Sequence, residues 1–238
     1  MGQKRSLSRL AASSAWTVSR RFIETAWLGA HVFSSVFFPD YCAACDAPVE
    51  RDQLFCASCG SCPAPPALGV GLDCWVGGCY APPLSTAIRR FKFSHRADLA
   101  RPLARLLPWP LEGLVASAAV RDWSVVPVPL HYTRLVERGF NPAGLLGRAL
   151  SQRVGAGFSP ELLQRHRTTA QQSRLPARER RANVAGAFRA SPSARGRRVV
   201  LVDDVVTTGS TLEACRQALY AAGVEHVTLL ALAAAPAS

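Results

Sequence analysis

The 238-residue chain has few acidic residues: 16 Asp and Glu stand against 28 Lys and Arg, which gives a formal net charge of +12 at pH 7. It contains no run of roughly 18 uncharged apolar residues, the length that a membrane-spanning helix needs. The nucleotide-binding patterns G-x-x-x-x-G-K-[ST] and G-x-G-x-x-G are also absent. We therefore expect a soluble, cytoplasmic protein that does not use either of these nucleotide-binding loops.

Nearly all of the positive charge comes from arginine. A surface with such a positive field attracts phosphate-bearing ligands or nucleic acid. A GC-rich genome also favours arginine codons whatever the function, so both explanations stay open. With 49% hydrophobic and 18% charged residues, the composition is typical of a globular protein, and the length suits one full α/β domain with a smaller addition.

The first 36 residues combine basic and apolar side chains. Arg20, Arg21 and Glu24 interrupt the apolar stretch that a signal peptide would need, and no A-x-A cleavage site follows. We expect a basic amphipathic leader over residues 1–36. It either docks onto the rest of the chain or lies on a membrane surface.

Seven of the eight cysteines fall between positions 42 and 79, and the first four form "CAACDAPVERDQLFCASC". These are two Cys-x2-Cys pairs, and two such pairs complete a tetrahedral four-sulfur shell for zinc. The predicted ligands are Cys42, Cys45, Cys56 and Cys59. A disulfide scaffold is the alternative, but it requires an oxidising compartment that nothing else in the sequence indicates. A shell of four thiolates leaves no open position for substrate, so we expect a structural zinc ribbon over residues 37–62.

The other four cysteines fit this pattern less well. Cys62 forms a further Cys-x2-Cys pair with Cys59 and could exchange with a ligand. Cys74 and Cys79 lie on a predicted strand without the spacing of a metal site, and Cys215 lies in a predicted helix. We expect these three thiols to be small buried groups.

The remainder of the chain alternates between strand and helix patterns. We expect a linker and first strand over residues 63–79 and an α/β domain over residues 80–238. Apolar residues at helical spacing follow Pro83, namely Ile88, Phe91, His95 and Leu99.

Three further segments complete the domain. "WSVVPVPL" reads as a buried strand, and Asn141 can cap a helix that has Pro142 in its first turn and runs to about Arg153. The arginine-rich stretch 165–188 has no apolar period and is predicted to be a long mobile loop. "RRVVLVDD", "STLEACRQALYAAG" and "VEHVTLLALAA" then read as strand, helix and strand of a parallel sheet.

The stretch "VVLVDDVVTTGSTL" places two acids where a buried strand ends, before a glycine-containing turn. In parallel α/β sheets, ligands bind beyond the carboxyl ends of the strands, so Asp203 and Asp204 should lie at the site. The turn leads into a helix N-terminus, where backbone N–H groups and the helix dipole favour a phosphate. The turn residues are Thr207, Thr208, Gly209, Ser210 and Thr211. This pattern indicates a receptor for a phosphorylated sugar.

A purely structural interpretation of the same turn is a capping box, S-x-x-E, formed by Ser210 and Glu213. Capping and phosphate binding are compatible. Capping alone does not explain the two adjacent acids, because like charges in contact repel unless something binds them.

"VVLVDDVVTTGST" resembles the 5-phosphoribosyl-1-pyrophosphate (PRPP) signature of type I phosphoribosyltransferases. Together with "FFPDYCAACDAP", "YAPPLSTAIRRFKFS", "VPVPLHYTRLVERGFNPA" and "RTTAQQSRLPARERRANVAGAF", it makes residues 37–236 similar to the ComF/GntX proteins. The resemblance implies a phosphoribosyltransferase-like parallel sheet flanked by helices, joined to an N-terminal zinc ribbon. For the ComF branch it also implies a role in bacterial DNA uptake during natural transformation.

The resemblance also implies roles for individual residues. Asp203 and Asp204 would contact the ribose hydroxyls with Mg²⁺, and residues 207–211 would hold the 5-phosphate. The turn 129–133 would lie near the pyrophosphate, and Arg134, Arg138 and the arginines of the loop 165–188 would be partners for its charge. This chain has "RGFNP" where the family pattern has "RGFNQ", so a side-chain contact made by that glutamine is absent.

Two classes of function follow from these patterns. As a phosphoribosyltransferase, the protein would use positioning and electrostatics, because no side chain stands out as a general base. As a non-catalytic competence protein, it would bind single-stranded DNA through its basic surface or dock partners of the DNA-uptake machinery. No segment carries a readable signature for an acceptor base.

Overall fold

The structure, a computed structural model, describes residues 40–50, 52–62, 64, 73–109, 120–166 and 186–235. The expected leader, most of the expected linker and the interior of the arginine-rich stretch lie outside the described residues. The chain divides into two compact units after Asp40, and residues 41–238 form one of them. The cysteine-rich segment and the α/β domain therefore belong to the same unit.

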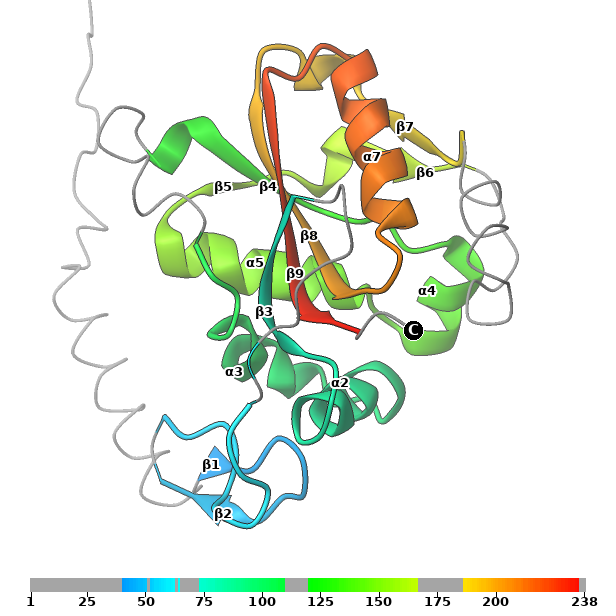
Figure 1. Cartoon of the computed structure of the whole chain (residues 1–238). Helices are drawn as coiled ribbons and strands as arrows, with labels where there is room; N and C mark the ends of the chain where they lie inside the picture. Colours follow the sequence, from blue (N-terminus) through cyan, green and yellow to red (C-terminus); the bar gives the residue numbers. More distant parts are fainter. Residues whose placement is uncertain are drawn as a thin grey trace, which may run out of the picture. The chain divides into compact units, whose positions relative to one another are not determined.

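A five-stranded parallel sheet forms the centre of this unit, in the order β3-β9-β8-β4-β5 (Figure 1). The strands are β3 (Cys74–Cys79), β4 (Trp123–Pro127), β5 (Gly157–Phe158), β8 (Arg198–Val206) and β9 (His226–Ala234). Strand β8 is central and pairs in parallel with β4 and β9. Its apolar run from Val199 to Val202 is fully buried, as expected for a strand covered on both faces.

Helices cover both faces of the sheet (Figure 1). On one face, Val200 and Val202 of β8 share a core with α2 (Leu84–Phe93), α3 (Ala100–Ala104) and α5 (Pro142–Val154). On the other face, Val199 and Leu201 pack with α7 (Ser210–Ala221). The alternation along β8 follows from the two-residue period of a strand. This arrangement confirms the predicted α/β class.

Helix α2 begins after Pro83 as predicted but ends earlier than the apolar spacing suggests. It stops at Phe93, and His95 has a left-handed backbone with φ 54°. A 3₁₀ turn, Ala97–Leu99, then leads into α3. Leu99 still reaches the core, so the apolar pattern is satisfied by a break followed by a second helical segment.

Smaller elements complete the described part. Helix α4 (Tyr132–Arg138) follows β4, and β6 (Leu163–Arg165) pairs antiparallel with β7 (Phe188–Ala190) across the arginine-rich stretch. In the cysteine-rich segment, β1 (Asp40–Tyr41) pairs with β2 (Pro48–Val49). Single 3₁₀ turns lie at Val120–Asp122, Pro160–Leu162 and Pro192–Ala194. Within the described ranges, no helix combines the length and apolarity needed to cross a bilayer.

Candidate functional site

A cavity of ≈ 490 Å³ lies at the carboxyl ends of β8 and β4. Its lining includes the end of β8, the following turn, the start of α7 and the segment after β4. Every residue that the sequence singled out for the sugar phosphate lines this cavity: Asp203, Asp204, Thr207, Thr208, Gly209, Ser210, Thr211, Arg134 and Arg138. The position agrees with the rule that parallel sheets bind ligands beyond their strand ends.

The two acids lie within β8, because the strand continues to Val206 instead of ending at Asp204. Successive side chains of a strand point to opposite faces, so Asp203 and Asp204 diverge across the sheet edge. The Asp204 carboxylate accepts a hydrogen bond from Lys92 Nζ of α2 at 2.6 Å. The Asp203 carboxylate accepts one from the backbone N–H of Asp204 at 2.8 Å. The expectation that only a ligand could relieve the charge of both acids is therefore wrong for Asp204, which has an internal partner.

Burial raises the pKa of Asp203 to about 7, and the neighbouring Asp204 carboxylate adds to this shift. The Lys92 ammonium and the Asp204 N–H act in the opposite direction but do not cancel it. Asp203 therefore holds its proton to a much higher pH than an exposed aspartate does. A cation bound beside Asp203 would favour its ionised form.

The turn after β8 has the conformation that a phosphate site requires. Gly209 occupies the N-cap position of α7 with φ 72°, a left-handed backbone that a residue with a side chain adopts only with strain. No side chain caps this helix, and the hydroxyls of Thr208 and Ser210 lie 2.9 Å apart. Backbone N–H groups at such a helix start are suited to binding an anion.

The expected capping box between Ser210 and Glu213 does not form. The N-cap is Gly209, so Ser210 is already the first helical residue, one position too late to cap. The Glu213 carboxylate instead pairs with Arg216 and accepts a hydrogen bond from Gln217. The purely structural explanation of this turn is therefore incorrect.

Arginines approach the cavity from two elements besides the sheet. Arg134 and Arg138 come from α4, and Arg165 comes from the end of β6. Burial lowers the pKa of both Arg138 and Arg165, and the charge of Arg134 lowers each further. Arg134 thus repels both of the other guanidinium groups, and positive charge gathered in a partly buried space favours a bound anion.

The segment between β4 and α4 borders the cavity through Pro129, Leu130, His131 and Thr133. The His131 ring caps α4 by accepting a hydrogen bond from the Thr133 N–H. Asn141 stands at the N-cap position of α5, but its side-chain amide donates to the Val128 carbonyl at 3.0 Å instead of capping the helix. Asn141 thereby ties the start of α5 to the segment after β4.

Two of the polar cavity residues that the sequence patterns missed are Tyr80 and Lys92. Lys92 lies off the apolar positions of its helix, so the helical spacing gives it no role. The one available signal was its chemistry: it is a single lysine in the otherwise arginine-based stretch "RRFKF". Arg165 stands where the predicted loop begins, and its position depends on the β6–β7 pairing, which the sequence did not reveal.

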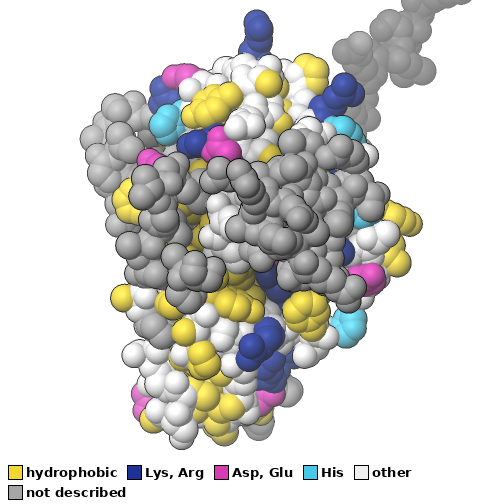
Figure 2. Space-filling model, turned by 45° about the vertical axis from the view of Figure 1, so that its right-hand side comes forward, with side chains coloured by type: hydrophobic (Ala, Val, Ile, Leu, Met, Phe, Trp, Pro, Cys, Tyr) yellow, Lys and Arg dark blue, Asp and Glu magenta, His cyan; other side chains and the backbone are white. Residues whose placement is uncertain are grey.

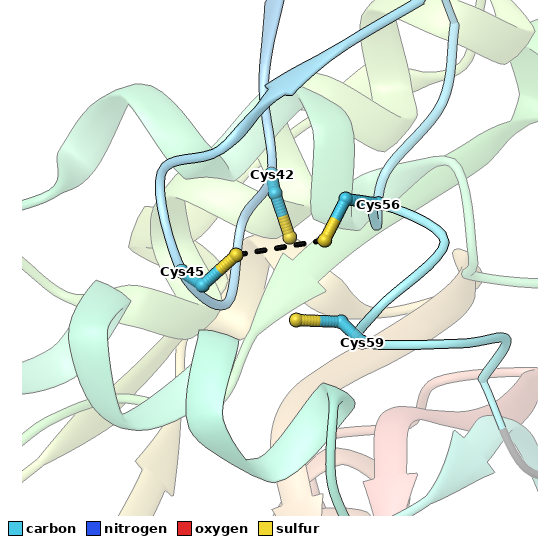
Figure 3. Close-up of side chains that lie close together, drawn as sticks. All are labelled: Cys42, Cys45, Cys56 and Cys59. Atoms are coloured by element: carbon cyan, nitrogen blue, oxygen red, sulfur yellow. Dashed lines mark hydrogen bonds between the residues drawn. The ribbon is translucent and has the colours of Figure 1, made fainter.

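The second candidate site is the cysteine cluster. The four predicted sulfurs, from Cys42, Cys45, Cys56 and Cys59, all lie within 4.8 Å of one another and point toward a common centre (Figure 3). The Sγ atoms of Cys45 and Cys56 are 3.6 Å apart. Zn–S bonds of about 2.3 Å in a tetrahedron place sulfurs roughly 3.8 Å apart, so the donor set fits a zinc ion.

The thiols in this cluster influence one another's ionisation. Burial opposes ionisation of Cys42, but hydrogen bonds from nearby backbone N–H groups lower its pKa to about 6. The neighbouring side chains of Cys45 and Cys56 raise the pKa of Cys59 to about 12. Four thiolates at this separation need a shared cation, which is how a metal ion would be held.

The other four cysteines lie outside this cluster. Cys62 packs against the core instead of joining the four sulfurs, and burial, with Cys79 nearby, raises its pKa. Cys74 and Cys79 lie at the two ends of β3 and are partly buried, whereas Cys215 is fully buried in α7. All eight cysteines are among the described residues, and none forms a disulfide.

Comparison with known proteins gives three kinds of match. A family model described as "Phosphoribosyl transferase domain" matches residues 137–238. The "DNA utilization protein YhgH" of Escherichia coli (strain K12) is 37% identical over 209 residues, which cover 80% of this chain and 88% of that protein. "Competence protein F" of Haemophilus influenzae is 35% identical over 203 residues, which cover 83% of this chain and 86% of that protein.

Among solved structures, an allosteric regulatory enzyme of purine biosynthesis matches 59% of this chain and 26% of its own, at 21% identity and a TM-score of 0.34. A hypoxanthine-guanine phosphoribosyl transferase of L. donovani matches 58% of this chain and 65% of its own, at 13% identity and a TM-score of 0.31. The parallel sheet and the family model together confirm the phosphoribosyltransferase-like fold class.

The raised pKa of Asp203 predicts how stability depends on pH. The folded protein holds the Asp203 proton up to about pH 7, whereas the unfolded chain releases it near the ordinary value of 3.8. The folded state therefore binds more protons across this window, and this group makes the free energy of unfolding fall as pH rises from about 4 to about 7. The fall is at most about 4 kcal/mol, at about 1.4 kcal/mol per pKa unit.

Urea denaturation of wild type and Asp203→Asn between pH 5 and pH 8 measures this contribution as the difference between the two proteins. Glu225→Gln is the control, because Glu225 is an exposed carboxyl beside Arg198 at the opposite end of the sheet. We expect Asp203→Asn to gain stability over wild type as pH rises to about 7, and Glu225→Gln to keep the wild-type slope. Parallel curves for wild type and Asp203→Asn would contradict the raised pKa.

Proposed function

Because this chain belongs to the ComF/GntX family, we propose that its cavity binds PRPP, or a closely related phosphorylated ribose, together with Mg²⁺. The observation that carries the proposal is a single cavity lined by an acidic pair, an uncapped glycine turn and three arginines. These features are suited to the three parts of one ligand: a diol, a 5-phosphate and a pyrophosphate.

The carboxylates of Asp203 and Asp204 bind the ribose hydroxyls and Mg²⁺ in this proposal. Carboxylate oxygens are ligands that Mg²⁺ prefers in proteins. Burial and, after it, the charge of Asp204 raise the pKa of Asp203, and a nearby divalent cation would offset both effects, which supports the metal.

The turn 207–211 binds the 5-phosphate through its backbone N–H groups and the hydroxyls of its threonines and serine. The pyrophosphate lies toward Arg134 and Arg138, beside the segment 129–133 and within reach of Arg165. Guanidinium groups bind phosphate oxygens in a fixed fork, which orients the pyrophosphate as well as neutralising it. Pro142, in place of the glutamine of the family pattern, is buried in the first turn of α5 and makes no polar contact of that kind.

The same cavity would support phosphoribosyl transfer. When bound, Mg²⁺ supplies charge neutralisation of the leaving pyrophosphate. The arginines hold the leaving group, the acids stabilise the ribose as positive charge develops, and the turn fixes the 5-phosphate end. A pyrophosphate-release assay with candidate nucleobase acceptors distinguishes a transferase from a protein that only binds this ligand.

Calorimetric titration with PRPP and Mg²⁺ tests the site. We expect the double variant Asp203→Asn, Asp204→Asn to lose at least about tenfold in affinity, corresponding to about 1.4 kcal/mol. Gly209→Ala should weaken binding by straining the turn against the phosphate, while titration with Mg²⁺ alone stays unchanged. Glu225→Gln is a matched removal of a carboxylate far from the cavity and should bind as wild type does. Equal affinity in all four proteins would show that the ligand binds elsewhere.

We also propose that the cysteine cluster holds one structural zinc ion per chain. Metal analysis of purified protein should give one zinc per chain, and Cys56→Ser should lose it together with part of the fold. Structural sites in finger peptides contribute about 10–16 kcal/mol of binding free energy, so removal of one ligand has a large effect. Cys74→Ser is the control, since Cys74 is also a partly buried thiol but lies outside the cluster. A zinc-free wild type, or full zinc content in Cys56→Ser, would refute the assignment.

Single-stranded DNA is a second ligand favoured by two observations, the net charge of +12 and the names of the two relatives. On the face shown in Figure 2, basic side chains stand at several separate places among uncharged and hydrophobic ones. Lys and Arg side chains bind the phosphates of a nucleic acid, and phosphate contacts carry no information about base sequence. In this proposal the protein acts in the cytoplasm, where its thiols remain reduced. Its partners there belong to the DNA-uptake machinery.

Fluorescence anisotropy with a labelled oligothymidine measures this binding. The logarithm of the affinity should fall with the logarithm of salt concentration with a slope of about −0.7 for each phosphate neutralised. Affinity should depend little on base sequence. A salt-independent affinity, or no binding at low salt, would argue against DNA as a ligand.

A further inference from the structure

Helix α2 connects the cysteine module, residues 41–62, to the cavity. At one end of this connection, Arg90 donates to the carbonyl of Ala43 at 3.2 Å and pairs with the carboxylate of Asp46. Arg96, beyond the end of the helix, binds the other oxygen of Asp46 at 2.7 Å. Asp46 directly follows Cys45, so these contacts reach the first pair of clustered cysteines.

Lys92 stands two residues after Arg90 on the same helix, and its ammonium binds Asp204 at 2.6 Å. The two side chains are only 15% and 14% exposed, so their separation is set by packing and not by solvent. Between Arg90 and Lys92, the fully buried Phe91 fixes the rotation of the helix. Ala43 of the cysteine module belongs to the same core cluster as Phe91.

We propose that Asp46 and Arg90 are positioning residues for the phosphoribosyl site, acting through Lys92 on Asp204. This inference rests on the proposed function of the cavity. The cysteine module sets the position of α2, α2 sets the position of the Lys92 ammonium, and the ammonium holds the Asp204 carboxylate in the orientation that receives the ribose. The module thus contributes to ligand binding without lining the cavity.

A change at Arg90 or Asp46 can reach the contact between Lys92 and Asp204 through helix α2. A charge-assisted hydrogen bond is short and directional, so a small shift of α2 changes how Lys92 and Asp204 meet. A partly buried carboxylate that loses its countercharge is destabilised, which favours a different orientation of the side chain. Packed cores transmit such shifts because they hold few voids.

The chain offers a matched pair of variants. Arg90→Gln removes the ion pair with Asp46 and weakens the hydrogen bond to Ala43, and it leaves the cysteines and the cavity lining unchanged. Arg105→Gln removes the exposed pair between Arg105 and Asp52, which joins the same module to the residue after α3. Both variants should keep the zinc content of wild type. Only Arg90→Gln should weaken the hydrogen bond between the Lys92 ammonium and Asp204.

The first measurement needs no ligand. The chain has two lysines, Lys4 and Lys92, so a lysine-selective ¹⁵N spectrum contains two ammonium signals, and Lys4→Arg assigns them. The hydrogen bond to Asp204 should protect the Lys92 ammonium from exchange with water. We expect this signal to broaden or disappear in Arg90→Gln and to stay in Arg105→Gln. An unchanged Lys92 signal in Arg90→Gln would overturn the inference.

The second measurement is a double-mutant cycle on PRPP affinity in the presence of Mg²⁺. Arg90→Gln should weaken binding by about three- to tenfold, the size of effect seen for residues that act through others. In the Lys92→Gln background it should have no further effect, because the residue through which it acts is gone. Equal weakening by Arg90→Gln in both backgrounds would overturn the inference, since a general structural role has that result. If wild type does not bind PRPP, the proposed function fails, and the ammonium spectra alone decide whether Arg90 positions Lys92.

Discussion

Two carboxylates at the end of a central buried strand need positive charge around them, and the surrounding elements supply it. Lys92 reaches Asp204 from α2, and Arg134 and Arg138 approach the cavity from α4. Burial and the charge of Arg134 lower the pKa of Arg138 and of Arg165, so positive charge is crowded at the cavity. A phosphate-bearing ligand bound in the cavity would compensate this positive charge.

Local patterns predicted the parts of this site that depend on one segment. The run "VVLVDD", the glycine turn and the following apolar helix are contiguous, so their physics is encoded in adjacent residues. The two Cys-x2-Cys pairs could be predicted for the same reason, because the two cysteines of each pair lie within one tight turn. The same local reasoning failed at Ser210, where the left-handed Gly209 takes the N-cap position and shifts the helix start by one residue.

Contacts between distant segments could not be predicted in this way. Lys92 and Asp204 are 112 positions apart, and their meeting depends on how α2 packs across the sheet. Arg165 reaches the cavity only because β6 pairs with β7. The divergence of Asp203 and Asp204 follows from β8 continuing to Val206, which β9 stabilises by pairing with it through Ala234. Each of these features arises from tertiary pairing that one segment's composition does not encode.

A comparison of the affinities of the whole ligand and of its fragments tests the central claim most directly. Calorimetry with PRPP, ribose 5-phosphate and inorganic pyrophosphate, each with Mg²⁺ at pH 8 where Asp203 is ionised, compares the whole ligand with its two ends. If one cavity holds the diol, the 5-phosphate and the pyrophosphate together, PRPP should bind at one molecule per chain and far more tightly than either fragment. Pyrophosphate binding as tightly as PRPP would contradict the account, because the acids and the glycine turn would then contribute nothing.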